Sequence, residues 1–268
     1  MAAKKLEWCV LGLGAVGREH MDSLSNLGRR IHAVCDPRIP DGMKVNEILV
    51  YREAGEDFWD EIEGRGLIIA TPTKHHHEHA MRAIDAGALA ILVEKPLTGD
   101  PVRSKEITDA AETDGVRLAT AYNYRFHKVS QDIYKWSRST DGPQHIAIMA
   151  ADRVVEWPRW GQEGYNASDP DGGGVVITSF PHSLDLACSI LGPVAAGTCR
   201  IHMDKIKPIK EPIPAGVIAV LDHPTRMRGA NLGPWMDRSV ISVRWGDTEN
   251  YSMVLCSGAG GATHFIFP

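Results

Sequence analysis

The stretch WCVLGLGAVG, residues 8–17, decides the fold of the first part of the chain. An apolar run leads directly into three glycines spaced as GxGxxG, a pattern typical of the turn between a β-strand and the helix of a dinucleotide-binding unit. Gly12 allows the tight turn, Gly14 lets the backbone approach a pyrophosphate, and Gly17 lets the helix lie close to the strand. The N-terminus of that helix offers N–H groups to the phosphates. The loop residues that we predict to bind the cofactor are Gly12, Leu13, Gly14, Ala15, Val16 and Gly17.

The second predicted strand ends in a carboxylate, Asp36, about twenty residues after the glycine turn, where an acidic side chain binds the ribose 2′-OH. The same carboxylate would repel the 2′-phosphate of NADP, so the sequence favours NAD as the cofactor. Arg38 follows closely and offers a partner for a 2′-phosphate, which keeps NADP as an alternative.

Outward from this motif, residues 6–121 alternate short β-rich runs with helical stretches, which indicates a parallel sheet built from βαβ units. We therefore predict a doubly wound α/β Rossmann domain over residues 1–122. Its expected strands are Trp8–Leu11, Ile31–Cys35, Ile48–Tyr51, Leu67–Ala70, Ala90–Val93 and Val116–Ala121. The helices expected between them are Val16–Leu27, Asp57–Ile62, His77–Ala86 and Val102–Thr113.

The pattern changes after an amphipathic stretch at Val129–Ser139, because strands now follow one another with little helix between them. We predict a second, α+β domain over residues 123–268 with an open, mostly antiparallel sheet. One helix, Val175–Leu191, interrupts the strands; it follows the turn Asp171–Gly174 and ends before Gly192. The expected strands are Gln144–Val154, Ala195–Met203, Val217–Leu221, Ser239–Trp245, Tyr251–Cys256 and Thr263–Phe267.

The composition narrows the classes of function. The 268 residues carry 29 basic and 34 acidic side chains, for a formal net charge of -5, with no basic stripe for nucleic-acid phosphates. No apolar run approaches the roughly 20 residues of a membrane span, and the start of the chain shows no cleavable leader. The five cysteines lack CxxC spacing, which argues against disulfides and a zinc site. We expect a cytoplasmic protein that binds a small-molecule substrate, with no nucleic-acid or membrane partner.

Two further segments end strands and therefore lie at the carboxyl edge of the parallel sheet, where open α/β proteins bind ligands. Thr71, Pro72 and Thr73 follow the fourth strand and are expected to line the nicotinamide half of the cofactor site. The fifth strand ends in Glu94 and Lys95, and the lysine is expected to project into the site beside a rigid proline. A strand-end Glu–Lys pair can also be a plain salt bridge.

A histidine-rich run, residues 74–79, begins the helix after Thr73. His75 and His79 are one helical turn apart and share a face, an arrangement that can hold a metal ion. Solvated neighbours are the commoner meaning of such a run, and we predict no metal site.

Taken together, the segments GLGAVG, ATPTKHH, VEKPL, YNYRFH and GGGVVITSFPHSLD resemble the glucose-fructose oxidoreductase, inositol dehydrogenase and rhizopine-catabolism (Gfo/Idh/MocA) family over about two-thirds of the chain. The resemblance implies a Rossmann domain followed by an open mixed sheet, which shapes the substrate pocket and often the oligomer interface. It also implies the reversible oxidation of a ring hydroxyl on a sugar, cyclitol or sugar derivative by NAD(P).

The resemblance assigns roles to particular side chains. Lys95 matches the family lysine that contacts both the reacting hydroxyl and the nicotinamide, where a cation stabilises a developing alkoxide. Asn123 and Arg125 match an Asn-x-Arg in a linker strand that orients this lysine or the substrate. His182, followed by Asp185, matches the expected proton shuttle. The further positions that we predict at the cofactor are His76, Glu94 and Asn123.

The sequence departs from the family pattern at two places. Thr178 stands where the family has an aspartate; it can donate a hydrogen bond but cannot hold a proton at neutral pH. Either His182 serves alone as the base or the natural reaction differs from alcohol oxidation. Tyr165 is a candidate replacement acid and Trp160 a candidate stacking surface for a sugar, although both side chains can equally be packing residues.

The second domain is also shorter than is usual in the family. A homo-oligomer through its sheet remains an expectation.

The leading hypothesis is an NAD(P)-dependent oxidoreductase that transfers a hydride between nicotinamide and a small polyhydroxylated substrate, with Lys95, His182 and Thr178 at the reacting centre. A reductase of an imine or conjugated substrate is one alternative, because a missing carboxylate matters less for it. A non-catalytic NAD(P)-binding sensor or assembly protein is another.

Overall fold

The computed structural model describes residues 5–40, 47–139, 144–156, 173–224, 236–245, 251–258 and 261–267. The chain divides into two compact units, one of residues Met1–Ala121 and one of residues Tyr122–Pro268. Within the described residues, each unit contains one six-stranded sheet. Among the candidate site residues, Trp160 and Tyr165 lie outside the described residues.

The first unit is built on a parallel sheet with the strand order β3-β2-β1-β4-β5-β6. This order, which doubles back at β1, confirms the doubly wound α/β prediction. Its strands are β1 (Trp8–Leu11), β2 (Ile31–Cys35), β3 (Leu49–Tyr51), β4 (Gly66–Ile69), β5 (Ala90–Val93) and β6 (Arg117–Thr120). Its helices are α1 (Ala15–Asn26), α2 (Glu56–Trp59), α3 (His76–Asp85) and α4 (Pro101–Thr113), with the 3₁₀ turns η1 (Asp60–Ile62) and η2 (Thr73–His75).

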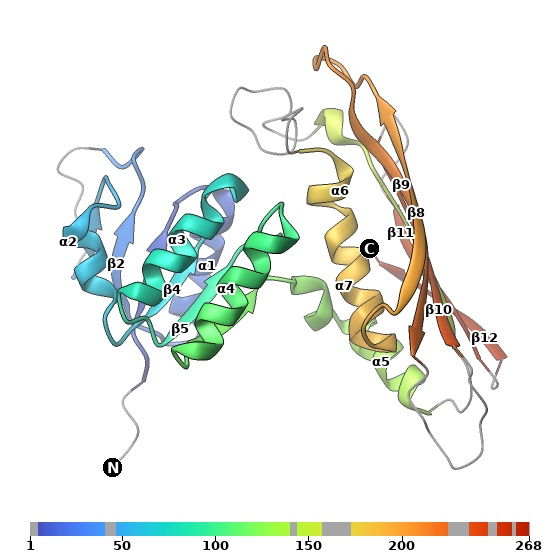
Figure 1. Cartoon of the computed structure of the whole chain (residues 1–268), viewed down its shortest axis with the longest axis horizontal. Coiled ribbons are helices and arrows are strands. Elements are labelled where there is room, and N and C mark those ends of the chain that lie inside the picture. Colours follow the sequence, from blue (N-terminus) through green and yellow to red (C-terminus); the bar gives the residue numbers. More distant parts are fainter. Residues whose placement is uncertain are drawn as a thin grey trace. The chain divides into compact units, whose positions relative to one another are not determined.

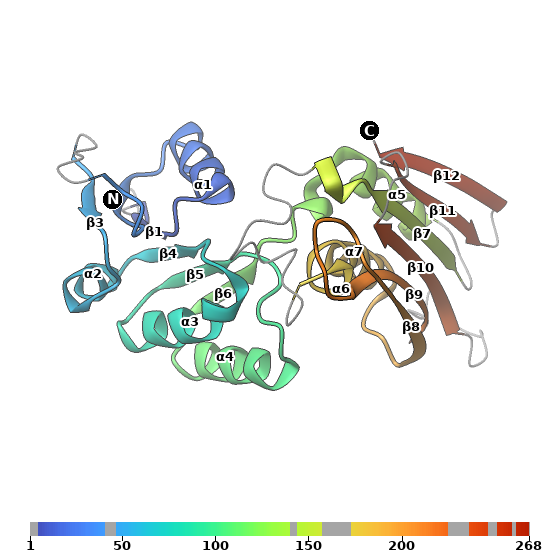
Figure 2. The same ribbon diagram turned by 90° about the horizontal axis from the view of Figure 1, so that it is seen from above.

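Helices cover both faces of this sheet, as Figure 2 shows, with α1 on one side and α3 and α4 on the other. Successive side chains along each buried strand point alternately into two hydrophobic cores. Val10 faces a core completed by Leu24 of α1, whereas Cys9 and Leu11 face a larger core to which α2, α3 and α4 contribute. Because both faces are filled, the carboxyl edge of the sheet is left for a ligand.

The second unit is a mixed sheet with the strand order β12-β11-β7-β10-β9-β8. Only the central pair β7–β10 is parallel among the described pairs, so the prediction of an open, mostly antiparallel sheet is confirmed. The strands are β7 (His145–Asp152), β8 (Ala196–Asp204), β9 (Ile213–Pro224), β10 (Met236–Trp245), β11 (Tyr251–Gly258) and β12 (Gly261–Phe267). The helical elements are η3 (Asn123–Phe126), α5 (Lys128–Ser139), η4 (Val154–Glu156), α6 (Val175–Thr178) and α7 (Phe180–Leu191).

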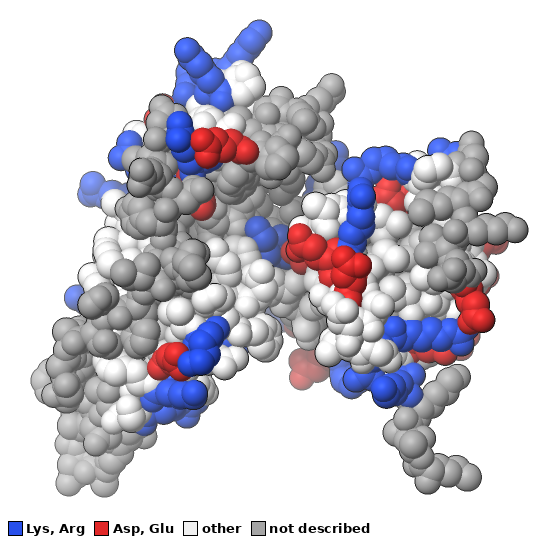
Figure 3. Space-filling view, turned by 180° about the vertical axis from the view of Figure 1, so that it is seen from behind, with Lys and Arg blue, Asp and Glu red and all other residues white. Residues whose placement is uncertain are grey.

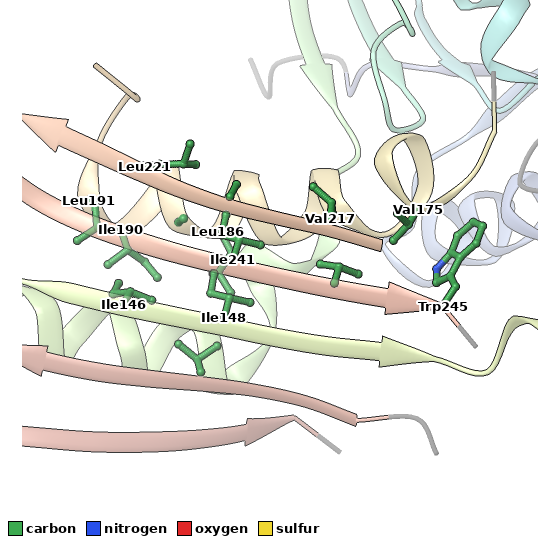
Figure 4. Close-up of a cluster of buried hydrophobic side chains, with 14 of the residues drawn as sticks. Ile146, Ile148, Val175, Leu186, Ile190, Leu191, Val217, Leu221, Ile241 and Trp245 are labelled. Atoms are coloured by element: carbon green, nitrogen blue, oxygen red, sulfur yellow. The ribbon is translucent and has the colours of Figure 1, made fainter. Parts of the chain in front are cut away.

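Helices α5, α6 and α7 lie on one face of the second sheet (Figure 1). Leu186 and Ile190 of α7 pack against Ile148 and Ile241 in the middle of the sheet, and Trp245 closes the core at the end of β10 (Figure 4). The opposite face carries exposed apolar side chains, among them Ile218, Val240 and Leu255. This unit therefore has one filled face and one open face.

Three expectations about local structure in the second unit were wrong. The predicted continuous helix is divided into α6 and α7 at Ser179, because Pro181 has no N–H to donate and favours the first turn of a new helix. Asn123 and Arg125 lie in the 3₁₀ turn η3 and not in a linker strand. The strand expected at Val217–Leu221 runs from Ile213 to Pro224, because pairing with both β8 and β10 extends it.

Candidate active site

The glycine loop of the first unit forms a cradle that the three glycines shape differently. Gly12 has a φ of 95°, and a Cβ there would lie 2.5 Å from the carbonyl oxygen of Ala70. A Cβ on Gly17 would collide with the carbonyl of Gly12, whereas one on Gly14 would approach only the Arg38 guanidinium, at 3.8 Å. Gly14 therefore leaves open space at the N-terminus of α1, where no side chain caps the helix. Space beside unsatisfied N–H groups fits a pyrophosphate.

Asp36, predicted to bind ribose, holds this loop in place. Its Oδ2 accepts a hydrogen bond from the Leu13 N–H at 2.7 Å, and its Oδ1 accepts one from the Arg38 N–H at 2.8 Å. The Arg38 guanidinium donates to both carboxylate oxygens. Burial acts to raise the pKa of Asp36, but these donors outweigh it and hold the pKa below its ordinary value. The carboxylate is thus charged, 3% exposed and committed to the loop, while the Arg38 side chain is 61% exposed above it.

His76 joins two of the loops at the carboxyl edge. The imidazole is 1% exposed, with Nδ1 2.9 Å from the carbonyl oxygen of Pro96 and Nε2 2.8 Å from that of Thr71. Burial lowers its pKa, and hydrogen bonds to the backbone only partly offset this effect. A neutral imidazole has one N–H and donates to one carbonyl at a time. Because its two nitrogens contact Thr71 and Pro96, His76 joins the segment after β4 to the segment after β5. Its place suits support of the cofactor loops more than contact with a ligand.

Glu94 connects the lysine segment to the first helix. Its Oε1 lies 2.8 Å from Nε2 of His20, and its Oε2 accepts a hydrogen bond from the Lys95 N–H at 3.1 Å. His20 was not among the site residues predicted from the sequence. The signal that could have found it is its position one turn after Gly17, on the helix that begins just after the carboxyl end of β1. Lys95 itself is half-buried in this edge.

Side chains of the histidine-rich run contact other protein groups. His79 packs face to face with His75, with ring centroids 5.6 Å apart, and its Nδ1 lies 3.1 Å from Oγ1 of Thr71. Burial lowers the pKa of His79 to about 4, so its ring is neutral. Among the described residues, no three His, Cys, Asp or Glu side chains are placed to hold a metal ion.

In the second unit, His182 stands between two aromatic rings. Its imidazole stacks on Tyr124, with centroids 4.5 Å apart, and meets Tyr122 edge-on at 6.2 Å. Burial raises the pKa of both tyrosines, so both rings are neutral phenols. The electron-rich face of Tyr124 can stabilise an imidazolium, which suits a histidine that takes up a proton.

Two other predicted residues of the second unit, Arg125 and Thr178, are bound to protein groups. Arg125 forms a bidentate ion pair with Asp185, with its Nε 2.6 Å from Oδ2, and so ties η3 to α7. The Thr178 hydroxyl donates to the carbonyl oxygen of Gly174 at 2.6 Å, one helical turn earlier. Thr178 therefore uses its proton within α6. Asn123 begins η3, next to Tyr124 and the His182 stack.

Comparison with known proteins agrees with this architecture. Residues 6–122 match the family model described as "Oxidoreductase family, NAD-binding Rossmann fold". The D-glucoside 3-dehydrogenase of Escherichia coli K12 is 25% identical over 212 residues, which make up 75% of this chain and 58% of that protein. The inositol 2-dehydrogenase of Corynebacterium glutamicum strain R is 27% identical over 56% of this chain and 46% of its own length. The chain thus spans about half the length of the curated relatives it matches.

Solved structures extend the likeness of fold to both units. The WlbA dehydrogenase of Bordetella pertussis, solved in complex with NADH and UDP-GlcNAcA, superposes with a TM-score of 0.78 and 16% identity over 97% of this chain and 78% of that one. A probable dehydrogenase from Thermotoga maritima gives a TM-score of 0.77 and 17% identity over 97% and 75%.

The glycine cradle and the doubly wound sheet of the first unit define the NAD-binding Rossmann architecture of an oxidoreductase family. The Rossmann domain of this chain, residues 6–122, belongs to the Gfo/Idh/MocA oxidoreductase family. This confirms the family resemblance and the expectation of a nicotinamide cofactor. No helix among the described residues is long and apolar enough to cross a membrane.

Proposed function

We propose that the protein is an NAD(P)-dependent dehydrogenase that acts on a ring hydroxyl of a small polyhydroxylated substrate such as a sugar, cyclitol or sugar derivative. The observation that carries this proposal is the glycine cradle at the N-terminus of α1, on the same sheet edge as Lys95. Sequence similarity to a glucoside dehydrogenase and an inositol dehydrogenase supports the substrate class. On the face drawn in Figure 3, basic and acidic residues are scattered among uncharged ones, which suits a small ligand better than a polyanion.

The residues take distinct roles in this proposal. The loop from Gly12 to Gly17 and the segment Thr71–Thr73 hold the dinucleotide, with Glu94 and His76 supporting the segments beside it. The bound nicotinamide supplies the hydride chemistry. Lys95 stabilises the oxygen of the reacting hydroxyl as its proton leaves, and His182 receives that proton.

The test begins with calorimetric titration of NADH and NADPH into the full chain. An absorbance screen of the oxidised cofactor against sugars, cyclitols and sugar acids follows. Lys95→Met should abolish turnover while the NADH Kd changes by less than about threefold, since the lysine acts on the reacting hydroxyl. Lys105→Met, at an exposed lysine paired with Asp109 on α4, is the matched control and should retain full activity.

Tight NADH binding without turnover of any substrate in the screen would overturn the dehydrogenase proposal in favour of a cofactor-binding sensor. Equal loss of activity in both lysine variants would remove Lys95 from its proposed role. Preference for NADH over NADPH is expected, because Asp36 stands where a 2′-phosphate would lie.

We also propose that a second copy of this chain covers the open face of the second sheet. Ile218 is 56% exposed, Leu255 is 40% exposed and Val240 is 38% exposed, and these side chains come from adjacent or next-adjacent strands. A monomer that exposes such a face would be prone to association. Val240→Arg should convert a dimer to monomer in analytical ultracentrifugation, whereas Val102→Arg, at an exposed valine of α4, should not. A monomeric native protein would contradict the proposal.

Finally, we propose a cytoplasmic location. All five cysteines are free thiols, and burial raises the pKa of Cys9, Cys35 and Cys256 to about 12. Unreactive buried thiols are typical of proteins in a reducing compartment. Subcellular fractionation tests this proposal, and recovery of the protein outside the cytoplasm would contradict it.

A further inference from the structure

A second strand-end carboxylate, Asp152, lies at the carboxyl edge of the second sheet. It is the last residue of β7, and its register partner on the parallel strand β10 is Trp245. Both side chains point to the face that α6 and α7 cover, because Ile148 and Val243, which face the core there, are an even number of residues earlier. Parallel neighbours end at the same edge, so Asp152 and Trp245 together border one end of the helical layer.

Asp152 is held through only one of its oxygens. Oδ2 accepts hydrogen bonds from the Ser179 hydroxyl at 2.6 Å and from Nε1 of Trp245 at 3.2 Å. Trp245 is 2% exposed and also donates to Ser179 at 3.0 Å, so the three side chains form a closed triangle. Within the part of the chain that the structure describes, no hydrogen bond reaches Oδ1. The carboxylate is half-buried and has one acceptor atom available.

The triangle adjoins the residues proposed to carry the chemistry. Ser179 directly follows Thr178, and its carbonyl accepts a hydrogen bond from the His182 N–H. Burial raises the pKa of the Tyr124 phenol, and the charge of Asp152 raises it further, so the carboxylate lies near the ring that stacks on His182. An acidic group therefore stands beside the helix junction where Thr178 cannot ionise.

A structural role alone does not require the charge. Both donors to Oδ2, a hydroxyl and an indole N–H, are neutral, and the amide oxygen of an asparagine would accept from them equally well. Retaining a half-buried carboxylate costs desolvation energy that a neutral amide avoids. Arg153, the next residue along the chain, pairs with Glu156.

We propose that Asp152 is a substrate-binding residue whose Oδ1 accepts a hydrogen bond from a hydroxyl of the substrate. This assignment rests on the proposed function, because it takes the substrate to be a polyol. An ionised carboxylate only accepts hydrogen bonds, so it selects an O–H donor and repels a phosphate or carboxylate at the same position. Asp152 thus favours neutral sugars and cyclitols over sugar phosphates and sugar acids.

The test compares Asp152→Asn with the native chain. The asparagine oxygen keeps the bonds to Ser179 and Trp245, but the charge is lost and an NH₂ donor replaces Oδ1. With NADH-saturated protein, calorimetry should show about 10- to 100-fold weaker binding of a neutral cyclitol or methyl glycoside, with a matching loss in kcat/KM. Binding of a hexose phosphate should weaken less, and the NADH Kd should not change.

The matched control is Asp222→Asn, which makes the same chemical change at the other end of the sheet. Asp222 pairs with Arg238 at the start of β10, roughly 20 Å along the strand from Trp245. Asp152→Glu keeps the charge and displaces it by one methylene, so an intermediate loss is expected. Deoxy analogues of the polyol provide a measurement on the native chain. Deletion of one particular hydroxyl should cost about tenfold in affinity. The affinity for that deoxy analogue should be the same in the native chain and in Asp152→Asn.

The outcomes separate this inference from the proposed function. If the native chain oxidises polyols and Asp152→Asn behaves like Asp222→Asn, Asp152 does not bind substrate and the dehydrogenase proposal stands. If polyols bind in an Asp152-dependent manner without turnover, the binding role stands and the dehydrogenase proposal fails. Absence of both binding and turnover overturns both. If Asp152→Asn does not fold, the deoxy series decides, and equal affinity for every analogue overturns the inference.

Discussion

Asp36 and Asp152 occupy equivalent places in the two units, each just at the end of a strand, yet the protein uses them differently. Asp36 is 3% exposed and both of its oxygens accept hydrogen bonds, from the glycine loop and from Arg38. Asp152 is half-buried and commits one oxygen to two neutral donors. The first site is built from backbone and a buried anchor, whereas the second is built from side chains. Substitutions should therefore damage the first through shape and the second through chemistry.

The largest expected effect breaks the shape of the first site. Gly17→Ala should lower the free energy of unfolding by more than about 3 kcal/mol, because its Cβ collides with the backbone of Gly12 and neither segment can move aside. Gly14→Ala is the matched variant, since its Cβ meets only a flexible guanidinium. It should change stability by less than about 1 kcal/mol but weaken NADH binding at least tenfold. Urea unfolding and calorimetry measure the two quantities.

Equal stability of the two alanine variants would show that close packing of α1 on β1 is not what Gly17 provides. Equal NADH affinity of Gly14→Ala and the native chain would place the pyrophosphate elsewhere.

His76 provides the next largest effect in the same unit. His76→Ala leaves the carbonyls of Thr71 and Pro96 without their imidazole partner and opens a cavity, so a loss of about 2–4 kcal/mol is expected. His77→Ala, one residue away at a partly exposed histidine paired with Glu106, should cost less than about 0.5 kcal/mol. If the two variants unfold at the same urea concentration, His76 does not join the loops as the structure indicates.

The contrast between the units also explains what the sequence could predict. The glycine motif, Asp36 and the strand-end segments follow from local rules of spacing, so the first unit and its cofactor loop were predictable in detail. The hydrogen-bond partners of Asp36 could not be predicted, because its contacts with Arg38 and with the Leu13 N–H form only in the folded loop. His20 was passed over for the same reason, as Glu94 is distant in sequence.

Asp152 was missed because nothing in its sequence context marks it. It ends a strand that resembles any other, and its partners Ser179 and Trp245 come from two other elements. Only the register of β7 on β10 brings Asp152 beside Trp245, and only the helix break at Ser179 turns that hydroxyl toward the sheet. The site of the second unit is a tertiary juxtaposition that a linear motif does not encode.

A smaller effect is expected where the second unit depends on an ion pair. Arg125→Ala leaves the carboxylate of Asp185, which is 9% exposed, without its bidentate partner. The guanidinium is about half exposed, which reduces the expected loss to about 1–2 kcal/mol. Turnover should fall by more than the loss of stability alone would cause, because η3 also carries Tyr124, on which His182 stacks. Lys128→Ala, at an exposed pair with Asp132, is the control for both measurements.

The smallest effect on stability, and the sharpest test of Asp36, comes from Arg38→Ala. Because Arg38 is 61% exposed in its side chain, its loss should change the free energy of unfolding by about 1 kcal/mol or less. The released Asp36 carboxylate gains access to the ribose hydroxyls, so NADH binding should strengthen about two- to threefold. NADPH loses its guanidinium partner and meets an uncovered carboxylate, so its binding should weaken about 3- to 10-fold.

The ratio of the two Kd values is the decisive quantity, because a general disturbance of the loop would weaken both cofactors together and leave the ratio unchanged. Arg103→Ala removes the same charge from the exposed surface of α4 and controls for long-range electrostatics. If Arg38→Ala shifts the ratio no more than Arg103→Ala does, the guanidinium only braces the loop. Selection between NAD and NADP would then depend on Asp36 alone, and Asp36→Asn would be the substitution that relaxes it.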